Sequence, residues 1–319
     1  MSLRIAFQMD PLEGLNIGGD STFALMLSAQ TRGYRSYTYT ADALNYSDGR
    51  VWAKAYPVEM VQRVKGDHYR LGDAVQLDLG ADVDAVMMRQ DPPFDLGYIT
   101  ATHLLERIAD HTLVVNDPVS VRNAPEKVFV LDYARFMPPT LVTRSYDEAR
   151  AFLDTHGEIV VKPLHGNGGK AIFKVGRDGA NLSSLIEVFN TAYREPHMVQ
   201  AFLPDVTAGD KRIVLIDGVV AGAVNRIPGE GEIRSNLAVG GKAAKTELTP
   251  DERAICEALG PELRKRGLLF VGIDVIGGKW LTEINVTSPT GIVAIDNFNG
   301  TDTAAMIWDA VEARLKARS

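Results

Sequence analysis

The sequence has very little cysteine, with Cys256 the single one among 319 residues. One cysteine cannot build internal disulfide bonds, which excludes a disulfide-stapled secreted domain and fits a reducing compartment. Cys256 lies in residues 252–265, whose pattern predicts a helix. We therefore expect a small buried side chain rather than a catalytic thiol.

Long apolar runs and an excess of positive charge are also missing. No run approaches the roughly 18 apolar residues of a membrane span, and the N-terminus enters a strand pattern without the basic and apolar regions of a secretion signal. The net charge of −7 disfavours a nucleic-acid scaffold, because binding a phosphate backbone needs clustered cations. These absences predict a cytoplasmic protein without nucleic-acid or membrane partners, and they leave room for a local basic pocket.

The N-terminal third alternates strand and helix patterns. Four strands are predicted, at "RIAFQM", "SYTYT", 83–89 and 112–116. The helices between them include one capped by Asp20 or Ser21 and one over 97–110. Such alternation is typical of a parallel sheet with helices on its faces, and ligands then bind at the carboxyl ends of the strands.

The rest of the chain predicts two further lobes. Pro125 ends a short link and suits the first turn of a helix over 125–134. Further predicted elements follow in order: a helix over 146–155, strands over 158–162 and 171–175, a helix, the strand "HMVQAFL", and antiparallel strands around a turn at Asp217 and Gly218. The polar, glycine-rich loop 228–241 is long enough to predict a lid or a binding loop.

Residues 161–173, "VKPLHGNGGKAIF", place three glycines and two lysines between apolar runs. The stretch fits neither the P-loop nor the dinucleotide template, and by itself it could be a flexible hairpin. However, Lys162 ends a strand that reads as buried, so its ammonium is held at the mouth of the loop as a point charge for phosphate. Gly166, Gly168 and Gly169 permit backbone angles that aim N–H groups at an anion. We therefore expect a phosphate site.

The segment "VGIDVIGGKWLTEINV" predicts a hairpin that gathers oxygen ligands. With a two-residue turn at 278–279, Asp274 lies opposite Glu283, and Asn285 shares their face. A three-residue turn would destroy this arrangement. Oxygen ligands alone suit Mg²⁺ or Mn²⁺ bridging phosphates, whereas the alternative is a polar face exposed to water. Thr282 should face the other way, so that Thr282→Val should be harmless.

Together these features resemble the ATP-grasp ligases, and among them the bacterial glutathione synthetases. The segments that carry the resemblance follow the same order over essentially the whole chain: "MRQDPPFD", "EKVF", "VKPLHGNGG", "GDKRIVLIDG", "NRIP…IRSNLAVGG", "GLLFVGIDVIG" and "LTEINVTSPTG". The resemblance implies an α/β and α+β fold. A Rossmann-like (pre-ATP-grasp) parallel-sheet domain at 1–122 would precede a two-lobed ATP-grasp fold, with its central lobe at 123–205 and its C-terminal lobe at 206–319.

The resemblance also implies a reaction. Enzymes of this family join γ-glutamylcysteine to glycine with ATP and Mg²⁺ or Mn²⁺, through an acyl phosphate. Family members form homo-oligomers, so a dimer or a tetramer is expected.

Matching positions then imply the site residues. ATP would be held by Lys127, Lys162, Gly166, Asn167, Gly168, Gly169, Gln200, Ala201, Phe202 and Leu203. The reacting phosphate and acyl group would be ordered by the catalytic residues Asp210, Arg212 and Arg226. The peptide substrate would meet Arg89, Asp91, Asn236, Ser288, Pro289 and Thr290. The metal ions would be bound by Asp274, Glu283 and Asn285.

Two departures and three rival interpretations accompany the resemblance. His165 stands where the family has an acidic residue, and Ala201 departs in the adenine segment. A D-alanine–D-alanine ligase or a glutamate-adding enzyme would keep the lysines and the acidic hairpin, but "NVTSPTG" and "DPPFD" disfavour both. A non-catalytic ATP-binding protein would have lost the metal acids or Arg212. A Rossmann oxidoreductase would carry a full dinucleotide fingerprint, which is missing.

Overall fold

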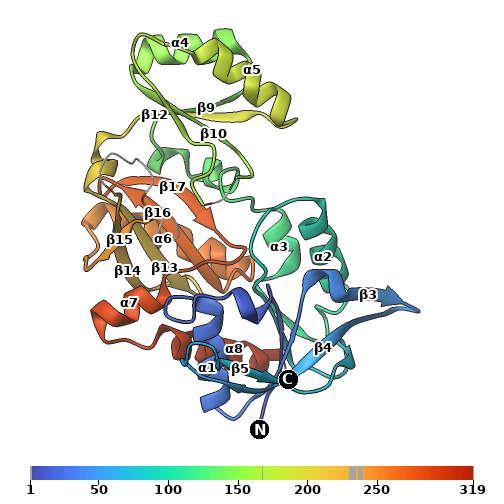
Figure 1. The fold of residues 1–319 in the computed structure, drawn as a ribbon. Coiled ribbons are helices and arrows are strands. Elements are labelled where there is room, and N and C mark those ends of the chain that lie inside the picture. Colours follow the sequence, from blue (N-terminus) through green and yellow to red (C-terminus); the bar gives the residue numbers. More distant parts are fainter. Residues whose placement is uncertain (1, 167, 230–234, 236–239, 319) are drawn as a thin grey trace.

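The computed structural model describes residues 2–166, 168–229, 235 and 240–318, and its strands form three sheets (Figure 1). The first sheet holds the N-terminal strands in the order β3-β4-β2-β1-β7-β8, with β5 and β6 paired to β4. Its strands are β1 (Arg4–Gln8), β2 (Arg35–Tyr39), β3 (Leu44–Ser47), β4 (Arg50–Val61), β5 (Tyr69–Leu71), β6 (Val75–Asp78), β7 (Ala85–Met88) and β8 (Leu113–Val115).

The parallel part of this sheet is the one that the sequence predicts. β1 pairs in parallel with β2 and β7, and β7 pairs in parallel with β8. Helix α1 (Ser21–Thr31) begins after Asp20, whose side chain accepts from the Phe23 N–H and is therefore the cap. Helix α2 (Leu96–Glu106) ends four residues before the predicted limit at residue 110. The antiparallel strands β3 to β6 were not foreseen.

The link between the first and second sheets contains helix α3 (Pro118–Arg122) but not the α-helix predicted over 125–134. A 3₁₀ helix, η3 (Phe129–Phe136), replaces it, with a kink at Tyr133. The carbonyl of Glu126 accepts a hydrogen bond from the Ile284 N–H at 3.2 Å. In an α-helix that carbonyl would be bonded within its own helix, so the contact with the third sheet takes the place of a helical turn.

The second sheet forms the upper lobe in Figure 1 and is entirely antiparallel, in the order β11-β10-β12-β9. Its strands are β9 (Thr140–Thr143), β10 (Ile159–Pro163), β11 (Phe173–Val175) and β12 (His197–Ala201). Helices α4 (Tyr146–His156) and α5 (Leu182–Ala192) cover one face. Their apolar side chains form a separate core with the sheet, which includes Leu153, Val161 and Phe189.

The third sheet is antiparallel and ordered β15-β14-β13-β16-β17. Its strands are β13 (Asp210–Ile216), β14 (Val219–Ile227), β15 (Lys242–Ala244), β16 (Phe270–Ile276) and β17 (Trp280–Asn285). The predicted turn between β13 and β14 is confirmed, since Asp217 and Gly218 both have positive φ. Helix α6 (Pro250–Lys265) carries Cys256, which is buried as expected; burial raises the pKa of its thiol to about 12.

The C-terminal helices join the first and third sheets into one body. Helix α7 (Ile292–Asn299) lies along β14, and α8 (Thr303–Arg318) lies beside α1. Trp308 on α8 is fully buried; its indole N–H donates to the Leu25 carbonyl at 3.0 Å, and its ring meets Phe7 edge to face. None of the described helices is long and apolar enough to cross a membrane.

Candidate active site

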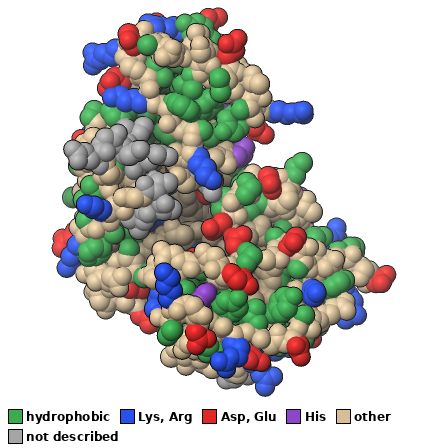
Figure 2. Space-filling model, in the orientation of Figure 1, with side chains coloured by type: hydrophobic (Ala, Val, Ile, Leu, Met, Phe, Trp, Pro, Cys, Tyr) green, Lys and Arg blue, Asp and Glu red, His purple; other side chains and the backbone are tan. Residues whose placement is uncertain are grey.

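A cleft lies between the second and third sheets and extends to Asp91 and Pro92 of the N-terminal part, and Figure 2 shows the surface hollowed below the upper lobe. It contains two cavities with empty volumes of about 910 and 920 Å³. Gly168, Asp274 and Glu283 line both cavities. A molecule that extends from one cavity into the other therefore passes these three residues.

Part of the lining of the first cavity is apolar and comes from both the second and the third sheets; we call it the apolar slot. The slot is lined by Pro138, Val160, Ile172, Phe202, Leu203, Val206 and Ile276. The predicted residues Gln200, Ala201, Phe202 and Leu203 all line this cavity. The Gln200 side chain donates to Thr140 Oγ1 at 2.9 Å, and the Lys174 ammonium lies 3.9 Å above the Phe202 ring. A flat aromatic group fits such a slot.

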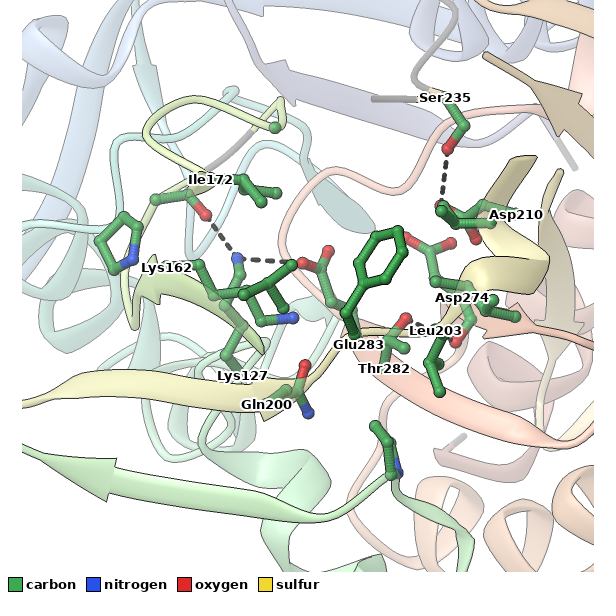
Figure 3. Close-up of a pocket in the computed structure, with 18 of the residues that line it drawn as sticks. Lys127, Lys162, Ile172, Gln200, Leu203, Asp210, Ser235, Asp274, Thr282 and Glu283 are labelled. Atoms are coloured by element: carbon green, nitrogen blue, oxygen red, sulfur yellow. Dashed lines mark hydrogen bonds and ion pairs between the residues drawn. The ribbon is translucent and has the colours of Figure 1, made fainter. Parts of the chain in front are cut away.

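Two buried lysines, Lys127 and Lys162, also line this cavity, and Figure 3 shows Glu283 pointing toward them. Lys127 Nζ donates to the Gly166 carbonyl at 2.6 Å and lies 3.2 Å from Glu283 Oε1. Burial alone would lower the pKa of Lys127, but the attraction of Glu283 and Glu126 outweighs burial and raises it. Lys127 is thus held as a cation within the protein.

Lys162 differs from its neighbour because it has no ion pair within the described part of the chain. It extends from β10, and burial lowers the pKa of its ammonium to about 8. Attraction by Glu283 opposes that shift, while repulsion by Lys127 adds to it. A buried cation without a partner is costly, so an incoming anion would relieve this cost.

The glycine loop connects β10 to β11 and covers the lysines. Gly168 and Gly169 both have positive φ, and a Cβ on Gly166 would lie 2.6 Å from Pro163 Cγ. Ala171 also has a positive φ, so β11 begins at Phe173 rather than at the predicted residue 171. Gly166, Gly168 and Gly169 line the first cavity. Asn167, a predicted ATP ligand, lies outside the described residues.

The acidic hairpin has the predicted pairing but not the predicted turn. Asp274 lies opposite Glu283, and Gly272 opposite Asn285. The turn has three residues, however, because Ile276 pairs with Trp280. A β-bulge between Asp274 and Val275 absorbs the extra residue and restores the register.

The bulge overturns the expectation that Thr282 faces away from the site. Thr282 lines the first cavity together with Glu283, and its hydroxyl donates to the Asp274 carbonyl at 3.1 Å. The apolar residues behind the hairpin are buried as predicted: Ile273, Val275, Ile284 and Val286. Two consecutive side chains of β17 therefore face the cleft.

Two arginines bind the acids across the third sheet. Arg212 is directly opposite Asp274 and donates to both carboxylate oxygens, at 2.6 and 3.0 Å. Arg226 is directly opposite Asp210 and lies 2.6 Å from its carboxylate and 3.0 Å from that of Asp274. Ser235 donates to Asp210 at 3.0 Å. Strand register thus explains how four charged residues come together.

Burial and the two arginines shift the pKa values of Asp210 and Asp274 in opposite directions. Burial would raise the pKa of Asp274, but Arg212 and Arg226 outweigh it and hold that pKa far below its usual range. Burial raises the pKa of Asp210 to about 6, although Arg226 opposes the shift. One oxygen of Asp210 has no hydrogen bond within the described residues. Asp210 is therefore the more readily protonated acid.

The donor set on the hairpin suits a hard divalent cation. Asp274, Glu283 and Asn285 offer only oxygen ligands to a common cavity, and the Asn285 amide donates to Asp274 at 3.3 Å. No group of three or more His, Cys, Asp and Glu side chains is arranged around a metal position in the described residues. The third donor is an amide, and the site fits an ion whose remaining ligands come from phosphate or water.

The second cavity brings together most of the predicted substrate residues. Asp91, Ser288, Pro289 and Thr290 line it, with Arg212 and Arg226. Arg89 does not line the cavity: it is buried beneath this segment and donates to the Pro289 carbonyl at 3.0 Å. Asn236 lies outside the described residues, as does most of the loop 228–241.

The polar residues of the site that sequence reasoning missed include Glu126, Thr282, Ser235 and Thr287. Glu126 lines the second cavity and accepts from the Thr287 hydroxyl at 3.3 Å. Burial raises its pKa to about 7, with Lys127 opposing and Glu283 adding to the shift. Its position in the sequence next to Lys127, a predicted ATP ligand, could have indicated that Glu126 lies in the site. Thr282 could be found only by recognising the bulge.

Comparisons with known proteins decide the family. The family model "Prokaryotic glutathione synthetase, N-terminal domain" matches residues 3–122, and "Prokaryotic glutathione synthetase, ATP-grasp domain" matches residues 126–300. The chain belongs to the prokaryotic glutathione synthetase family. Its activity is that of this family, an ATP-dependent formation of a carbon–nitrogen bond that yields glutathione from small-molecule substrates.

A relative and two solved structures agree with this membership. The glutathione synthetase of Rhodopseudomonas palustris is 56% identical over 98% of this chain and 99% of its own. D-cycloserine synthetase DcsG has a similar fold, with a TM-score of 0.69, 18% identity, and 98% and 99% of the two chains covered. The ATP-grasp ligase PsnB, solved with minimal precursor, Mg and ADP, has a TM-score of 0.61 at 18% identity over 98% of each chain. The fold is therefore ATP-grasp, and such ligases use ATP with a divalent metal.

Proposed function

We propose that the two cavities divide the reaction between ATP and the dipeptide, with ATP in the first and γ-glutamylcysteine in the second. The observation that carries this proposal is the sharing of Gly168, Asp274 and Glu283 by both cavities. The terminal phosphate of ATP must reach the glycyl-accepting carboxylate of the dipeptide. Residues common to both cavities are the natural place for that transfer, because both reactants can approach them.

ATP would lie with adenine in the apolar slot beside Gln200, Ala201, Phe202 and Leu203, and with its phosphates against the lysines. Lys162 supports this assignment, because its cationic form lacks a partner among the described residues and gains one when phosphate binds. Gly166, Gly168 and Gly169 would cover the phosphates with backbone N–H groups. Asn167, in the same loop, is also proposed to bind ATP.

Asp274, Glu283 and Asn285 would hold Mg²⁺ or Mn²⁺. Their oxygen donors fit either ion. When bound, the metal neutralises phosphate charge. In the protein described here, Arg212 and Arg226 occupy the Asp274 carboxylate, and Lys127 is paired with Glu283. A bound metal ion would therefore share the carboxylates of Asp274 and Glu283 with these arginine and lysine side chains.

The side chains where the two cavities meet would position the reacting groups for phosphate transfer. Arg212 and Arg226 face the second cavity and carry fixed positive charge to the place where phosphate and acyl oxygens meet. Asp210 holds Arg226 in position through its 2.6 Å ion pair. Asp91, Asn236, Ser288, Pro289 and Thr290 would meet the dipeptide, with Arg89 supporting that segment from beneath. The glycine amine would then displace phosphate from the acyl phosphate.

The division of the chain into 1–122, 123–205 and 206–319 also stands as a proposal. It is supported by the three separate sheets and by the separate core of the second sheet. A homodimer or homotetramer and a cytoplasmic location are proposed with it, on the family resemblance and on the lone buried cysteine.

The decisive experiment measures phosphate release from ATP with γ-glutamylcysteine and glycine each omitted in turn. We expect phosphate release to require the dipeptide, and glutathione to appear only when glycine is added. D-Alanine serves as the control acceptor and donor. Equal ATP turnover with D-alanine alone would overturn the assignment of the second cavity to γ-glutamylcysteine.

A further inference from the structure

An aromatic contact joins the two loops that border the cleft. The imidazole of His165, in the glycine loop, stacks on the ring of Phe94 with centroids 6.1 Å apart and planes at 21°. Aromatic pairs attract over centroid distances of about 4.5–7 Å. Phe94 is itself held by Tyr98, a buried residue of α2, at 5.3 Å. The contact therefore links the glycine loop to the N-terminal part of the chain.

The two loops serve different substrates in the proposed function. On one side, the glycine loop covers the lysines of the first cavity, and Lys127 holds its Gly166 carbonyl. On the other side, Phe94 is three residues from Asp91, which lines the second cavity. A small pocket between the loops, with an empty volume of about 230 Å³, is lined by Pro92, Phe94, Pro125, Glu126, Leu164 and His165. The seam between them is thus mainly apolar.

The side chain of His165 contributes an aromatic ring to this seam and no charge. His165 lines neither of the two large cavities, and its side chain is exposed. Partial burial lowers the pKa of His165, Glu195 opposes that shift and Lys127 adds to it, so the neutral imidazole predominates at neutral pH. Direct contact with ATP does not account for the side chain, whereas stacking on Phe94 does.

We propose that His165 is a positioning residue whose stacking on Phe94 couples the dipeptide site to the glycine loop, so that each substrate strengthens binding of the other. The inference rests on the proposed division of the cavities. A dipeptide bound at the 91–95 segment orders Phe94, and Phe94 then holds His165 and the loop over the phosphates. Because coupling between two binding sites is reciprocal, ATP must tighten dipeptide binding by the same factor.

The test measures binding without turnover. The dissociation constant of a non-hydrolysable ATP analogue is determined for the full chain with and without saturating γ-glutamylcysteine. In the unaltered protein the dipeptide should tighten analogue binding by about fivefold or more, within the usual range of such coupling. In His165→Ala the factor should fall below about twofold, and in His165→Phe, which keeps a ring, it should be retained.

A double-mutant cycle and a matched control complete the design. Phe94→Ala should lose the coupling as His165→Ala does, and the double variant should lose no more than either alone. His156 contacts Phe152 with ring centroids 4.3 Å apart on α4, away from the cleft, so His156→Ala should keep the full factor. This control removes a histidine–phenylalanine contact from the same lobe without touching the seam.

Three results would overturn the inference: no coupling in the unaltered protein, coupling retained in His165→Ala, or coupling lost equally in His165→Phe. Each can occur in an enzyme that still makes glutathione from γ-glutamylcysteine and glycine. Failure of the proposed division of the cavities is distinguishable, because Ser288→Ala in the second cavity would then leave the dissociation constant of the dipeptide unchanged.

Discussion

Glu283 lines both cavities and shares an ion pair with Lys127, so replacing it with glutamine removes a charge while keeping the shape. We expect Glu283→Gln to lower turnover by about 10²–10³, as loss of one transition-state electrostatic contact does. The unfolding free energy should also fall, by about 1.5–3 kcal/mol, because buried Lys127 loses a charged hydrogen-bond partner. The sequence alone predicted no loss of stability, since the pair with Lys127 was not visible there.

Steady-state kinetics and urea unfolding measure the two effects of Glu283→Gln. Thr282→Val is no longer a neutral control, because Thr282 lines the same cavity. Glu262→Gln replaces it: Glu262 lies on α6 and pairs with Arg266 at 2.7 Å. Turnover should be unchanged in that control. Full turnover in Glu283→Gln at low Mg²⁺ would count against the metal site.

Lys162 provides a pH-dependent test of the phosphate site. Its pKa is lowered to about 8 in the folded protein from the 10.5 that is ordinary for a lysine, so the folded state disfavours the charged form. Below pH 8 the buried lysine is charged, and the full cost of burying the cation lowers the unfolding free energy. Between pH 8 and 10.5 the unfolded state binds more protons than the folded state. The unfolding free energy therefore rises with pH over this range, and the cost is lost. A shift of this size corresponds to roughly 3 kcal/mol.

We therefore expect Lys162→Met to stabilise the ATP-free protein at pH 7 by up to about 3 kcal/mol, with the gain disappearing towards pH 10.5. The same variant should lose the rise in melting temperature that ATP gives the unaltered protein. Urea unfolding at several pH values measures the first effect. Lys54→Met, which replaces an exposed lysine of β4, should leave the unfolding free energy unchanged at every pH. A destabilised Lys162→Met at pH 7 would show that Lys162 is paired in the free protein.

At the scale of elements, the turn between β13 and β14 packs closely against α6. Gly218 has φ +76°, and a Cβ there would lie 2.2 Å from the Gly260 carbonyl oxygen. Gly300 has a similar φ of +67° but nothing within 4 Å. Gly300→Ala should therefore cost only the left-handed backbone penalty, about 1–2 kcal/mol.

Gly218→Ala should cost about 1–3 kcal/mol more than Gly300→Ala, because the turn and the helix backbone must also move apart. Chemical unfolding of both variants measures the difference. Equal costs in the two variants would show that the turn can move away from α6 without penalty.

The acidic hairpin shows what sequence could and could not predict at this scale. The pairing of Asp274 with Glu283 follows from strand alternation, since apolar residues behind the hairpin must face the core. The bulge was not predictable in this way, because the same apolar pattern fits the hairpin with or without it. A two-residue turn and a three-residue turn with a bulge give the same pairing. They differ in where Thr282 points.

The antiparallel strands of the first sheet were missed for a different reason. Pro57 lies within β4, and an interior proline normally argues against a strand. A usable signal was present at Asp48 and Gly49, which form a tight turn with positive φ between β3 and β4. The parallel strands β7 and β8 were predictable because their apolar runs are continuous, whereas the position of Arg89 beneath the 288–290 segment required tertiary contacts.

At the scale of the whole molecule, the face of the second sheet under α4 and α5 has its own core, whereas Met198 of β12 belongs to a core shared with the other sheets, and a further core joins the first and third sheets alone. Phe189→Ala should therefore loosen the upper lobe alone. Ile307→Ala should loosen α1, β1 and β16 together, because Ile307 lies in the core that joins the first and third sheets. Each substitution should cost about 2–5 kcal/mol within its own unit.

Hydrogen exchange followed by mass spectrometry distinguishes these units. In Phe189→Ala, faster exchange should be confined to 140–201, and in Ile307→Ala it should spare that range. Faster exchange throughout the chain in both variants would show that the lobes unfold as one cooperative unit.

The contact between Trp308 and Leu25 also determines when the protein can finish folding during its synthesis. The two residues are 283 positions apart, yet the indole bonds the backbone of α1. While the ribosome is still making the third sheet, α1 has emerged without the helix that covers it. At about 5–20 residues per second, that interval lasts roughly 14–60 seconds. An exposed apolar helix face for that long is a binding site for a nascent-chain chaperone.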